Sequence, residues 1–345
     1  MTNADAPFLR ACRREKTAFT PVWLMRQAGR YLPEYRALRA KHDFLTLCKT
    51  PAAATEVTLQ PIERLGVDAA ILFADILLVL EPLGVGLEFT RGEGPHIARP
   101  VRSAEDVSRL APVDVPSSVG FVFETVRLVR KALADRVPLV GFAGAPFTLA
   151  SYLIEGGASR EFLHTKRFMR AEPAAWHALM ARLAGITVGY LNGQIGAGAQ
   201  AVQLFDSWVG TLSPADYREF VLPHVRHILS DVETLGVPVI HFGTGTATLL
   251  ELMKEAGGDV LGLDWRVDLG PTWDRLGGDV AVQGNLDPAV LLAPVPEIRR
   301  VAGAILDGAA RRPGHIFNLG HGVHQETPVD HVRALVDMVH EMSAR

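Results

Sequence analysis

The feature that most constrains this chain is an alternation of two sequence patterns along its whole length. Short apolar runs are each followed by an amphipathic stretch, and such near-continuous runs are typical of parallel strands buried on both faces. Eight units of strand and helix fit a closed barrel better than an open sheet. The sequence therefore predicts an α/β fold, a single-domain (β/α)8 TIM-type barrel. The predicted strands are Pro21–Met25, Ala69–Phe73, Val137–Phe142, Ala201–Phe205, Val237–Phe242, Val260–Leu263, Val280–Gln283 and His315–Leu319.

Helix starts are marked by a capping side chain placed directly before a proline. The side-chain oxygen of such a residue can accept the free N–H groups of the first turn, and proline is tolerated at the first helical position. Four pairs carry this signal, at Thr50-Pro51, Ser213-Pro214, Asp287-Pro288 and Thr327-Pro328.

Two stretches interrupt the alternation and predict a distorted barrel. Residues 26–48 follow the first predicted strand and are rich in arginine. Residues 82–116 follow the second, and their period-two apolar pattern before Arg91-Gly92-Glu93-Gly94-Pro95 predicts an inserted hairpin. We expect one domain over residues 1–345, with residues 1–20 as an N-terminal extension. Both insertions follow the carboxyl end of a strand, where the active sites of this fold form.

Composition excludes several classes of protein. With 345 residues, of which 48% are hydrophobic, and a net charge of −3, the chain has no global attraction for nucleic acid. Its two cysteines make no disulfide framework and favour a reducing, cytoplasmic setting. The longest apolar run, Ala69–Leu80, is interrupted by Asp75 and is shorter than the ~20 residues that span a bilayer. We expect no membrane partner.

Arginines gather directly after the first predicted strand. Arg26, Arg30, Arg36 and Arg39 lie within fourteen residues, opposed there only by Glu34. The planar guanidinium matches a carboxylate bidentately, so the cluster indicates a polyanionic ligand. Taken alone, Arg36 and Arg39 fit a solvated helix face better. Arg26 and Arg30, at a strand end, favour ligand contact, and Arg39 is kept as a third candidate.

A single carboxylate ends the second predicted strand, in the sequence Phe73-Ala74-Asp75. A charge in such apolar surroundings is costly unless it is hydrogen-bonded or paired. Two interpretations stay open for Asp75. It caps a helix or pairs with a buried arginine, or it accepts N–H groups of a ligand and opposes a developing positive charge.

Three further side chains at predicted strand ends are weaker candidates. Tyr152 and Ser207 fit a core tyrosine and a strand terminus as well as they fit ligand contacts, whereas His321 between two glycines favours a ligand. His241 and Asp264 also lie at strand ends, without an assigned role. The chain has no dinucleotide or Walker loop and no Cys–His spacing for zinc, which predicts no metal and no cofactor.

These strand ends carry a family resemblance. The segment from Pro21 to Glu34, PVWLMRQAGRYLPE, is similar to the N-terminal signature of uroporphyrinogen decarboxylases. The segment from Phe142 to Leu149, which continues to Tyr152, resembles a second signature of that family. Further similarity covers Ile71–Leu77, Phe205–Trp208, Gln283–Pro288 and Asn318–Gly322.

The resemblance implies a distorted barrel that converts the four acetate arms of uroporphyrinogen III to methyls, giving coproporphyrinogen III in haem and tetrapyrrole biosynthesis. It implies no metal or prosthetic group and a homodimer. Position by position, Asp75 matches the carboxylate that binds pyrrole N–H groups, and Phe73 precedes it. The substrate-binding loop matches Arg26, Gln27, Ala28, Gly29 and Arg30, while Tyr152, Ser207 and His321 match substrate contacts. Asp75, Arg26 and Tyr152 are the expected catalytic residues.

Two other functions are compatible with parts of this pattern. A zinc-dependent methyltransferase on a related barrel would need thiolate ligands near the later strands, but no cysteine follows Cys48. A non-catalytic tetrapyrrole carrier could use the same arginines, with His321 on a haem iron. A carrier would release no CO₂ from uroporphyrinogen.

Overall fold

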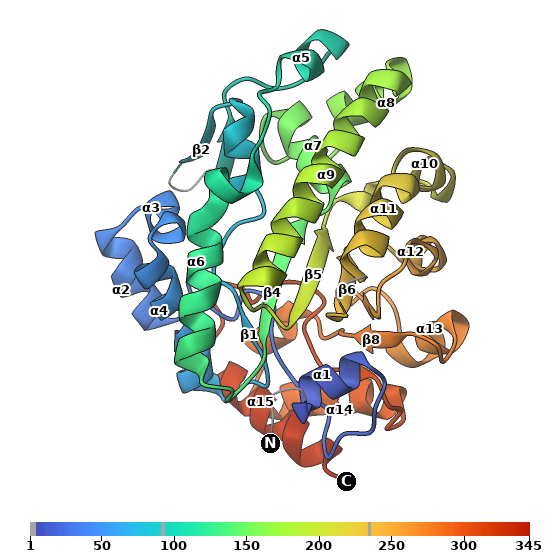
Figure 1. Cartoon of the computed structure of the whole chain (residues 1–345). Coiled ribbons are helices and arrows are strands. Elements are labelled where there is room, and N and C mark those ends of the chain that lie inside the picture. Colours follow the sequence, from blue (N-terminus) through green and yellow to red (C-terminus); the bar gives the residue numbers. More distant parts are fainter. Residues whose placement is uncertain (1–4, 91–93, 234–235) are drawn as a thin grey trace.

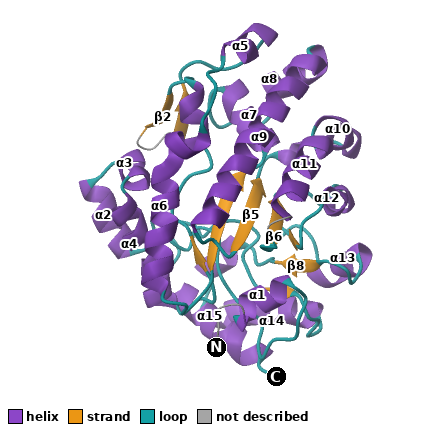
Figure 2. Ribbon diagram, viewed as in Figure 1, coloured by secondary structure: helices purple, strands orange, loops and turns teal. Residues whose placement is uncertain are grey.

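A curled sheet of parallel strands forms the centre of the molecule, and helices surround it (Figure 1, Figure 2). The structure is a computed structural model that describes residues 5–90, 94–233 and 236–345. The seven strands follow one another in the order β1-β4-β5-β6-β7-β8-β9, which confirms the predicted barrel-type α/β fold. The strands are β1 Ala70–Ile71, β4 Leu139–Gly144, β5 Ala201–Asp206, β6 Val239–Gly243, β7 Val260–Gly262, β8 Ala281–Gln283 and β9 His315–Ile316.

The first predicted strand, residues 21–25, is wrong as a strand, although the segment occupies the place of one. It forms only an isolated parallel bridge, between Val22 and Phe317, with the Phe317 amide donating to Pro21 O at 2.8 Å. On its other side, Val22 O accepts the Asp68 amide at 2.8 Å, and the Val22 amide donates to the Asp68 carboxylate at 2.7 Å. The segment therefore closes the barrel between β9 and β1.

In the rest of this segment, backbone amides donate hydrogen bonds to side chains, where in a strand they would donate to the neighbouring strand. The Leu24 amide donates to Gln27 Oε1 at 3.0 Å, and the Met25 amide donates to Asn318 Oδ1 at 3.0 Å. Backbone N–H groups that bond to side chains cannot continue a strand ladder. The apolar pattern correctly predicts that this segment is buried. It does not show whether the backbone amides bond to side chains or to a neighbouring strand.

In the described ranges, one helix before β1 and seven helices between or after the strands cover the outside of the sheet (Figure 1). Neighbouring helices pack on one another, as α6 does on α4 and α9, and α14 does on α15. These outer helices are α4 Pro51–Leu65, α6 Val115–Leu133, α9 Pro173–Ala197, α11 Leu222–Glu233, α12 Leu250–Ala256, α13 Leu269–Leu276, α14 Val295–Ala309 and α15 Val329–Ser343.

Shorter elements fill the loops. The 82–116 region contains β2 and β3, which pair antiparallel from Leu87↔Ile97 to Thr90↔Gly94, as expected for a hairpin. Residues 91–93 of its predicted turn, and residues 1–4 of the predicted N-terminal extension, lie outside the described residues. The shorter elements are α1 Pro7–Cys12, α2 Pro33–Lys41, α3 Phe44–Lys49, η2 Leu78–Leu83, β2 Leu87–Thr90, β3 Gly94–Ile97, α5 Ala104–Arg109, α7 Pro146–Glu155, α8 Leu163–Ala171, η3 Val209–Thr211, α10 Pro214–Phe220 and η4 Pro288–Leu292.

A helix begins at or next to each of the four proline-marked starts, but only two of the four expected capping hydrogen bonds are present. Ser213 accepts an amide of the first turn of α10, and Asp287 does the same for η4, which is a 3-10 helix. The Thr50 hydroxyl instead donates to Thr46 O at 2.7 Å, and the buried Thr327 hydroxyl has no partner in the described residues. Pro51 occupies the first helical position of α4, where its preset φ suits the helix, whereas α15 begins at Val329 with Pro328 as its N-cap, one residue later than expected.

Polar side chains cross the interior of the barrel. Trp23 Nε1 donates to Gln283 Oε1 at 3.0 Å, and Gln283 Nε2 donates to Gln203 Oε1 at 2.9 Å. Gln203 Nε2 in turn contacts Met25 Sδ at 3.5 Å. Because β5 and β8 are not sheet neighbours, these bonds run through the barrel. They link the 21–25 segment to both strands and hold it below the mouth.

Candidate active site

A tight turn at the end of the 21–25 segment exposes Arg26 while it buries Gln27. Arg26 has φ 60°, a left-handed conformation that is uncommon outside glycine and costs of order 1 kcal/mol. Gln27 is fully buried, and its side-chain amide donates to Ala69 O at 3.0 Å besides accepting the Leu24 amide. Both polar atoms of the Gln27 side chain therefore hold the backbone of the turn in place. The substrate contact expected at Gln27 stays a prediction.

The following residues continue the exposed loop. Ala28 and Gly29 are half-buried, and a Cβ at Gly29 would lie 2.9 Å from Arg26 O, so the turn requires glycine there. Arg30 is exposed, and its carbonyl accepts Arg36 Nη1 at 3.0 Å. Neither Arg26 nor Arg30 forms an ion pair with a carboxylate in the described part of the chain. Both guanidinium groups are therefore open to an anionic ligand.

Arg39 lies on α2, against an aromatic group that reaches Phe73. Its Nη1 donates to His42 O at 2.5 Å, and its guanidinium lies 5.8 Å from the centroid of the Phe44 ring. The Phe44 and Phe73 rings are 6.0 Å apart, and the Tyr35 ring lies 5.7 Å from Phe73. Phe73 is buried, so it forms the packed edge of this group rather than an exposed surface.

Asp75 lies just beyond β1, half-buried, and no ion pair engages it. Its Oδ1 accepts the Leu77 amide at 2.8 Å, while Oδ2 has no hydrogen-bond partner among the described residues. Burial raises the pKa of Asp75, and the Leu77 amide and the charge of Arg26 partly oppose this rise. The bond to Leu77 forms a local turn before η2 Leu78–Leu83, whose N-cap is Leu77 without a side-chain cap, so the helix-cap interpretation of Asp75 is not supported. No arginine pairs with Asp75 among the described residues, and its second oxygen is available to a ligand.

Tyr152 and Ser207 lie in the segments after β4 and β5, the two strands that follow β1 in the sheet. Tyr152 lies on α7, and its ring is 5.9 Å from that of Trp208. Burial and then the nearby charge of Asp75 raise the pKa of Tyr152, so its hydroxyl stays protonated at neutral pH. Ser207 is half-buried after β5, and its carbonyl accepts the Thr244 hydroxyl at 2.5 Å. The Ser207 hydroxyl itself has no partner in the described ranges.

His321 lies between two glycines that allow close contacts. A Cβ at Gly322 would overlap the side chain of Arg26, so the arginine stem lies directly on this glycine. Burial, followed by the charges of Arg26 and Arg266, lowers the pKa of His321 to about 4. The imidazole is therefore neutral at pH 7 and can both donate and accept a hydrogen bond.

Four predicted residues thus meet in one region. The charge of Arg26 acts on the pKa of Asp75, Tyr152 and His321, and the charge of Asp75 acts on that of Tyr152. Such interactions fade over the Debye length of ~10 Å, so these side chains lie near one another at this end of the barrel.

Arg30 and Arg39 gather slightly apart, around Tyr35. Their charges act on the pKa of Tyr35 rather than on the groups at the mouth. Arg39 and Asp75 both act on the pKa of the buried Cys48, so this second cluster adjoins the first. Cations that lie apart suit a ligand that carries several separate carboxylates.

Sequence reasoning missed an aromatic row at the mouth. Phe142, Phe205 and Phe242 come from β4, β5 and β6, with neighbouring ring centroids 5.6 and 5.8 Å apart. Phe205 is half-buried and lies two residues beyond the inward-facing Gln203 on the same strand. That alternation was the signal that could have placed it inside the barrel. Phe142 and Phe242 are buried and support Phe205, which is the ring of this row that a ligand could contact.

The two strand-end residues without an assigned role differ in burial and contacts. His241 is fully buried, and its Nδ1 contacts Met253 O of α12 at 3.4 Å, so it lies in the layer between sheet and helix. Asp264 accepts the Gly245 amide at 2.5 Å and pairs with Arg266 at 2.6 Å. Asp264 therefore ties together the loops that follow β6 and β7.

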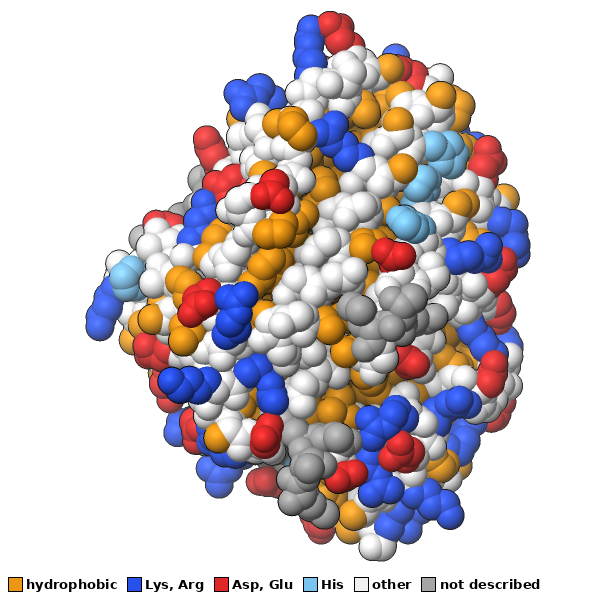
Figure 3. Space-filling view, in the orientation of Figure 1, with side chains coloured by type: hydrophobic (Ala, Val, Ile, Leu, Met, Phe, Trp, Pro, Cys, Tyr) orange, Lys and Arg blue, Asp and Glu red, His pale blue; other side chains and the backbone are white. Residues whose placement is uncertain are grey.

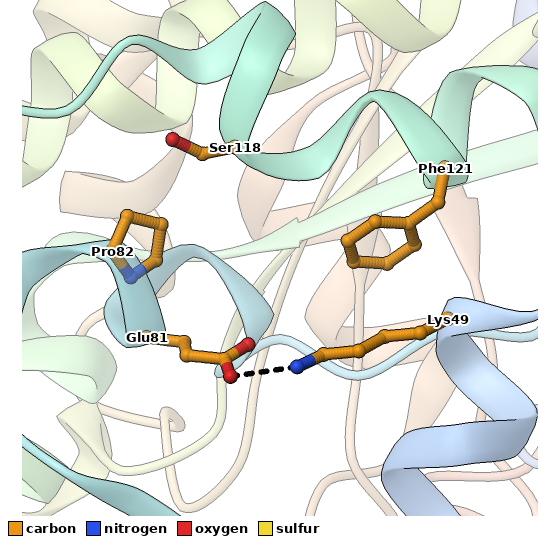
Figure 4. A pocket seen from close by; sticks show the side chains of 5 residues that line it. All are labelled: Lys49, Glu81, Pro82, Ser118 and Phe121. Atoms are coloured by element: carbon orange, nitrogen blue, oxygen red, sulfur yellow. Dashed lines mark hydrogen bonds and ion pairs between the residues drawn. The ribbon is translucent and has the colours of Figure 1, made fainter.

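A separate cavity of about 320 Å³ lies among α3, η2 and α6 (Figure 4). Lys49 and Glu81 form an ion pair of 2.6 Å at its wall, and Ser118 and Phe121 line the other side. None of the predicted site residues lines it. Its two charged groups neutralise each other, which makes it a poor place for a polyanion.

The described ranges lack two features that other kinds of function would need. No helix there is both long and apolar enough to cross a membrane. No group of three or more His, Cys, Asp and Glu side chains there is placed to hold a metal ion. Cys12 and Cys48 are both buried as free thiols.

Comparison with known proteins decides which family this site belongs to. Residues 3–342 match the family model described as uroporphyrinogen decarboxylase (URO-D). The chain belongs to the uroporphyrinogen decarboxylase family. A uroporphyrinogen decarboxylase of Carboxydothermus hydrogenoformans is 57% identical over 98% of this chain and 96% of the relative. One of Sorangium cellulosum is 58% identical over 97% of this chain and 96% of the relative.

The barrel itself is shared more widely than the uroporphyrinogen decarboxylase family. A methyltransferase from Methanosarcina mazei superimposes with a TM-score of 0.80 at 20% identity, and 99% of each chain is covered. Likeness at that identity concerns the fold alone. The family assignment rests instead on relatives more than half identical along nearly the whole chain, which disfavours the zinc-dependent methyltransferase interpretation.

Proposed function

We propose that this chain is a carboxy-lyase that converts the four acetate arms of uroporphyrinogen III to methyls and releases coproporphyrinogen III, in haem and tetrapyrrole biosynthesis. The proposal rests on the environment of Asp75. It has one oxygen held by Leu77 and one without a partner, and it shares the mouth with Arg26, Tyr152 and His321. Relatives more than half identical carry the same activity in their names.

The chemistry needs an electron sink, which the substrate supplies. An acetate on a pyrrole cannot lose CO₂ directly, because the electron pair left behind has no acceptor. Protonation of the adjacent ring carbon makes an iminium cation, and CO₂ leaves with its electron pair going to this sink. The resulting enamine is protonated at the exocyclic carbon to a methyl, and loss of the proton added to the ring carbon restores the pyrrole, so that each arm takes up one proton in total. We therefore propose that the enzyme works without metal or prosthetic group.

Asp75 is proposed to accept pyrrole N–H bonds and to stabilise the cation by its fixed negative charge. A preorganised charge in a site from which water is largely excluded contributes about 3–4 kcal/mol, against the ~8–23 kcal/mol that enzymes supply in total. Asp75 is thus a large contributor and not a sufficient one. Ligand N–H groups would also satisfy its open oxygen.

Arg26 is proposed to hold an acid arm and to orient the water that delivers the proton. An arginine with pKa above ~12 is itself a poor acid near neutral pH. Tyr152, whose raised pKa keeps it protonated, can donate a hydrogen bond to the reacting carboxylate. Arg30, Arg39, Ser207 and His321 are proposed to contact the arms, with Ala28, Gly29 and Phe73 shaping the wall.

Three properties of the whole chain complete the proposal. We propose one barrel domain over residues 1–345, with 82–116 as an insertion in the loop after β1. We propose a homodimer and a cytoplasmic location, for which the two buried free thiols are suited.

The test is anaerobic incubation of the purified protein with uroporphyrinogen, followed by product analysis and CO₂ release. We expect stepwise loss of four carboxyl groups, and no reaction of the oxidised, planar uroporphyrin, which cannot form the same iminium. Binding of uroporphyrinogen without CO₂ release would identify a carrier and overturn the proposal.

A further inference from the structure

A cation that the proposed mechanism does not use lies at the β7 side of the barrel mouth. Arg266 follows β7 by four residues, and its side chain is 51% exposed. Its Nη1 pairs with Asp264 Oδ2 at 2.6 Å, and its amide donates to Asp264 Oδ1 at 3.0 Å. Its guanidinium lies 4.0 Å from the centroid of the Trp265 ring. The group is therefore aligned by an ion pair and by stacking.

The supporting carboxylate is itself firmly held. Asp264 has only 2% of its side chain exposed, and it accepts the Gly245 amide at 2.5 Å from the loop after β6. One edge of the Arg266 guanidinium thus meets a fixed carboxylate. Its Nε and Nη2 have no hydrogen-bond partner among the described residues. An anion could bind this free edge without breaking the pair.

The position of Arg266 relative to the mouth follows from the glycine at 320. A Cβ on Gly320 would overlap the backbone of Trp265, so the two loops are in direct contact. The charges of Arg26 and Arg266 both act on His321, which follows Gly320. Arg266 therefore belongs to the surroundings of His321 although 240 residues separate it from Arg26.

We propose that Arg266 binds a carboxylate arm of the tetrapyrrole, one that is not being decarboxylated, and so helps to set which arm reaches Asp75. This inference rests on the proposed function. A ligand with acid arms around its rim needs cations at separated points, and the cluster of Arg26, Arg30 and Arg39 comes from one stretch of chain. Arg266 adds a point from another loop, prealigned by Asp264.

The chain offers a matched control in Arg312. Its Nη1 pairs with Asp274 at 2.6 Å, and its guanidinium lies 4.4 Å from the centroid of the Trp273 ring. It thus makes the same two kinds of contact, but at the end of α14 against α13, in the helix layer. Loss of an ion pair and of stacking affects both sites, whereas loss of ligand binding affects only Arg266.

The experiment compares Arg266→Gln with Arg312→Gln. Under anaerobic conditions we expect Arg266→Gln to raise the KM for uroporphyrinogen about tenfold, the ratio for one lost charged contact of ordinary strength, with kcat within about twofold of the wild type. Arg312→Gln should leave both within about twofold. Arg266→Lys, which keeps the charge without the planar fork, should fall between them.

A binding measurement separates this inference from the proposed function. Quenching of tryptophan fluorescence by uroporphyrinogen gives the dissociation constant whether or not CO₂ is released. If the wild type binds uroporphyrinogen without turnover, the proposed function is wrong. The dissociation constants of Arg266→Gln and Arg312→Gln then still show whether Arg266 binds the ligand. If the KM and the dissociation constant of Arg266→Gln match those of Arg312→Gln, Arg266 is a structural residue and the inference is wrong.

Discussion

The arginines at the barrel mouth and those on the outer helices differ in their partners. Arg26 and Arg30 have no carboxylate partner in the described chain, although Asp75 lies close enough to Arg26 to feel its charge. On the outer helices, Arg299 pairs with Glu341 at 2.5 Å and Arg300 pairs with Glu297. Figure 3 shows positive and negative side chains next to one another over the outer helices.

This difference separates two uses of the same side chain. Exposed ion pairs contribute about 0–1 kcal/mol each, so the outer pairs can be exchanged at little cost. If Asp75 closed on Arg26 at the mouth, the carboxylate oxygen that is open to a ligand would be occupied. A carboxylate left open at one oxygen beside unpaired cations therefore indicates binding, not stabilisation.

Asp75→Asn is the change from which we expect the largest effect on the mouth. It removes the charge that opposes the developing cation, so kcat should fall about 10²–10³-fold. Burial raises the pKa of Asp75 above its unfolded value, so the ionised form disfavours folding at neutral pH. The variant should therefore melt no lower than the wild type.

Asp279→Asn is the matched change on the outer surface, where the carboxylate pairs with Lys254 at 2.6 Å. Anaerobic kinetics and thermal melts should find its activity unchanged. Near-normal turnover in Asp75→Asn would remove the distinction between the two regions.

Arg26→Lys should have the next largest effect. It keeps the positive charge but loses the planar fork, and we expect kcat/KM to fall by about a hundredfold. Arg300→Lys makes the same change at a pair with Glu297 and should leave kcat/KM within about twofold. Equal kcat/KM values for the two variants would contradict a special role for the arginine at the mouth.

Gly322→Ala tests the contact that positions Arg26. The added Cβ would overlap the arginine stem, which must move, and we expect about a tenfold loss in kcat/KM. In Gly185→Ala, within α9, the new methyl meets nothing within 4 Å and should stabilise the helix by about 0.5–1 kcal/mol. Kinetics should therefore show a loss of kcat/KM in Gly322→Ala alone, and thermal melts should show a higher melting temperature in Gly185→Ala. Unchanged kinetics in Gly322→Ala would mean that the mouth tolerates displacement of Arg26.

The smallest expected effect is on the pH dependence of stability, not on activity, and it concerns the buried side chains of His241 and Asp206. Burial lowers the pKa of His241 to about 4, below its unfolded value, so folding loses stability as pH falls from about 6.5 to 4. This histidine adds at most about 1.4 kcal/mol per pH unit to the slope. Asp206 has the opposite sign, because burial raises its pKa to about 7 and a rise in pH from 4 to 7 costs stability.

Urea unfolding at several pH values isolates the contribution of His241. His241→Gln should reduce the slope of unfolding free energy against pH by about 1 kcal/mol per unit. His227→Gln, at an exposed position of α11, should leave the slope unchanged. An unaltered slope in His241→Gln would show that folding does not lower the pKa of this side chain.

Much of the fold and part of the site could be predicted from the chain. Seven of the eight apolar runs contain a strand, because burial on both faces leaves a continuous apolar signal. Arg26, Asp75, Tyr152 and His321 do meet, since the ends of parallel strands open on one face. The backbone hydrogen bonds of the Gln27 side chain could not be predicted, because the local sequence does not distinguish a glutamine that bonds to backbone groups from one that bonds to a ligand.

The sequence by itself determined the alternating architecture and the family, because apolar periodicity and long motifs are local properties of the chain. The tertiary structure alone decided that residues 21–25 close the barrel through side-chain and backbone bonds. It also decided that Arg26 lies on Gly322 and that Arg266 adjoins His321. These contacts join loops far apart in the chain, and their geometry is set by how the barrel closes, which no local pattern records.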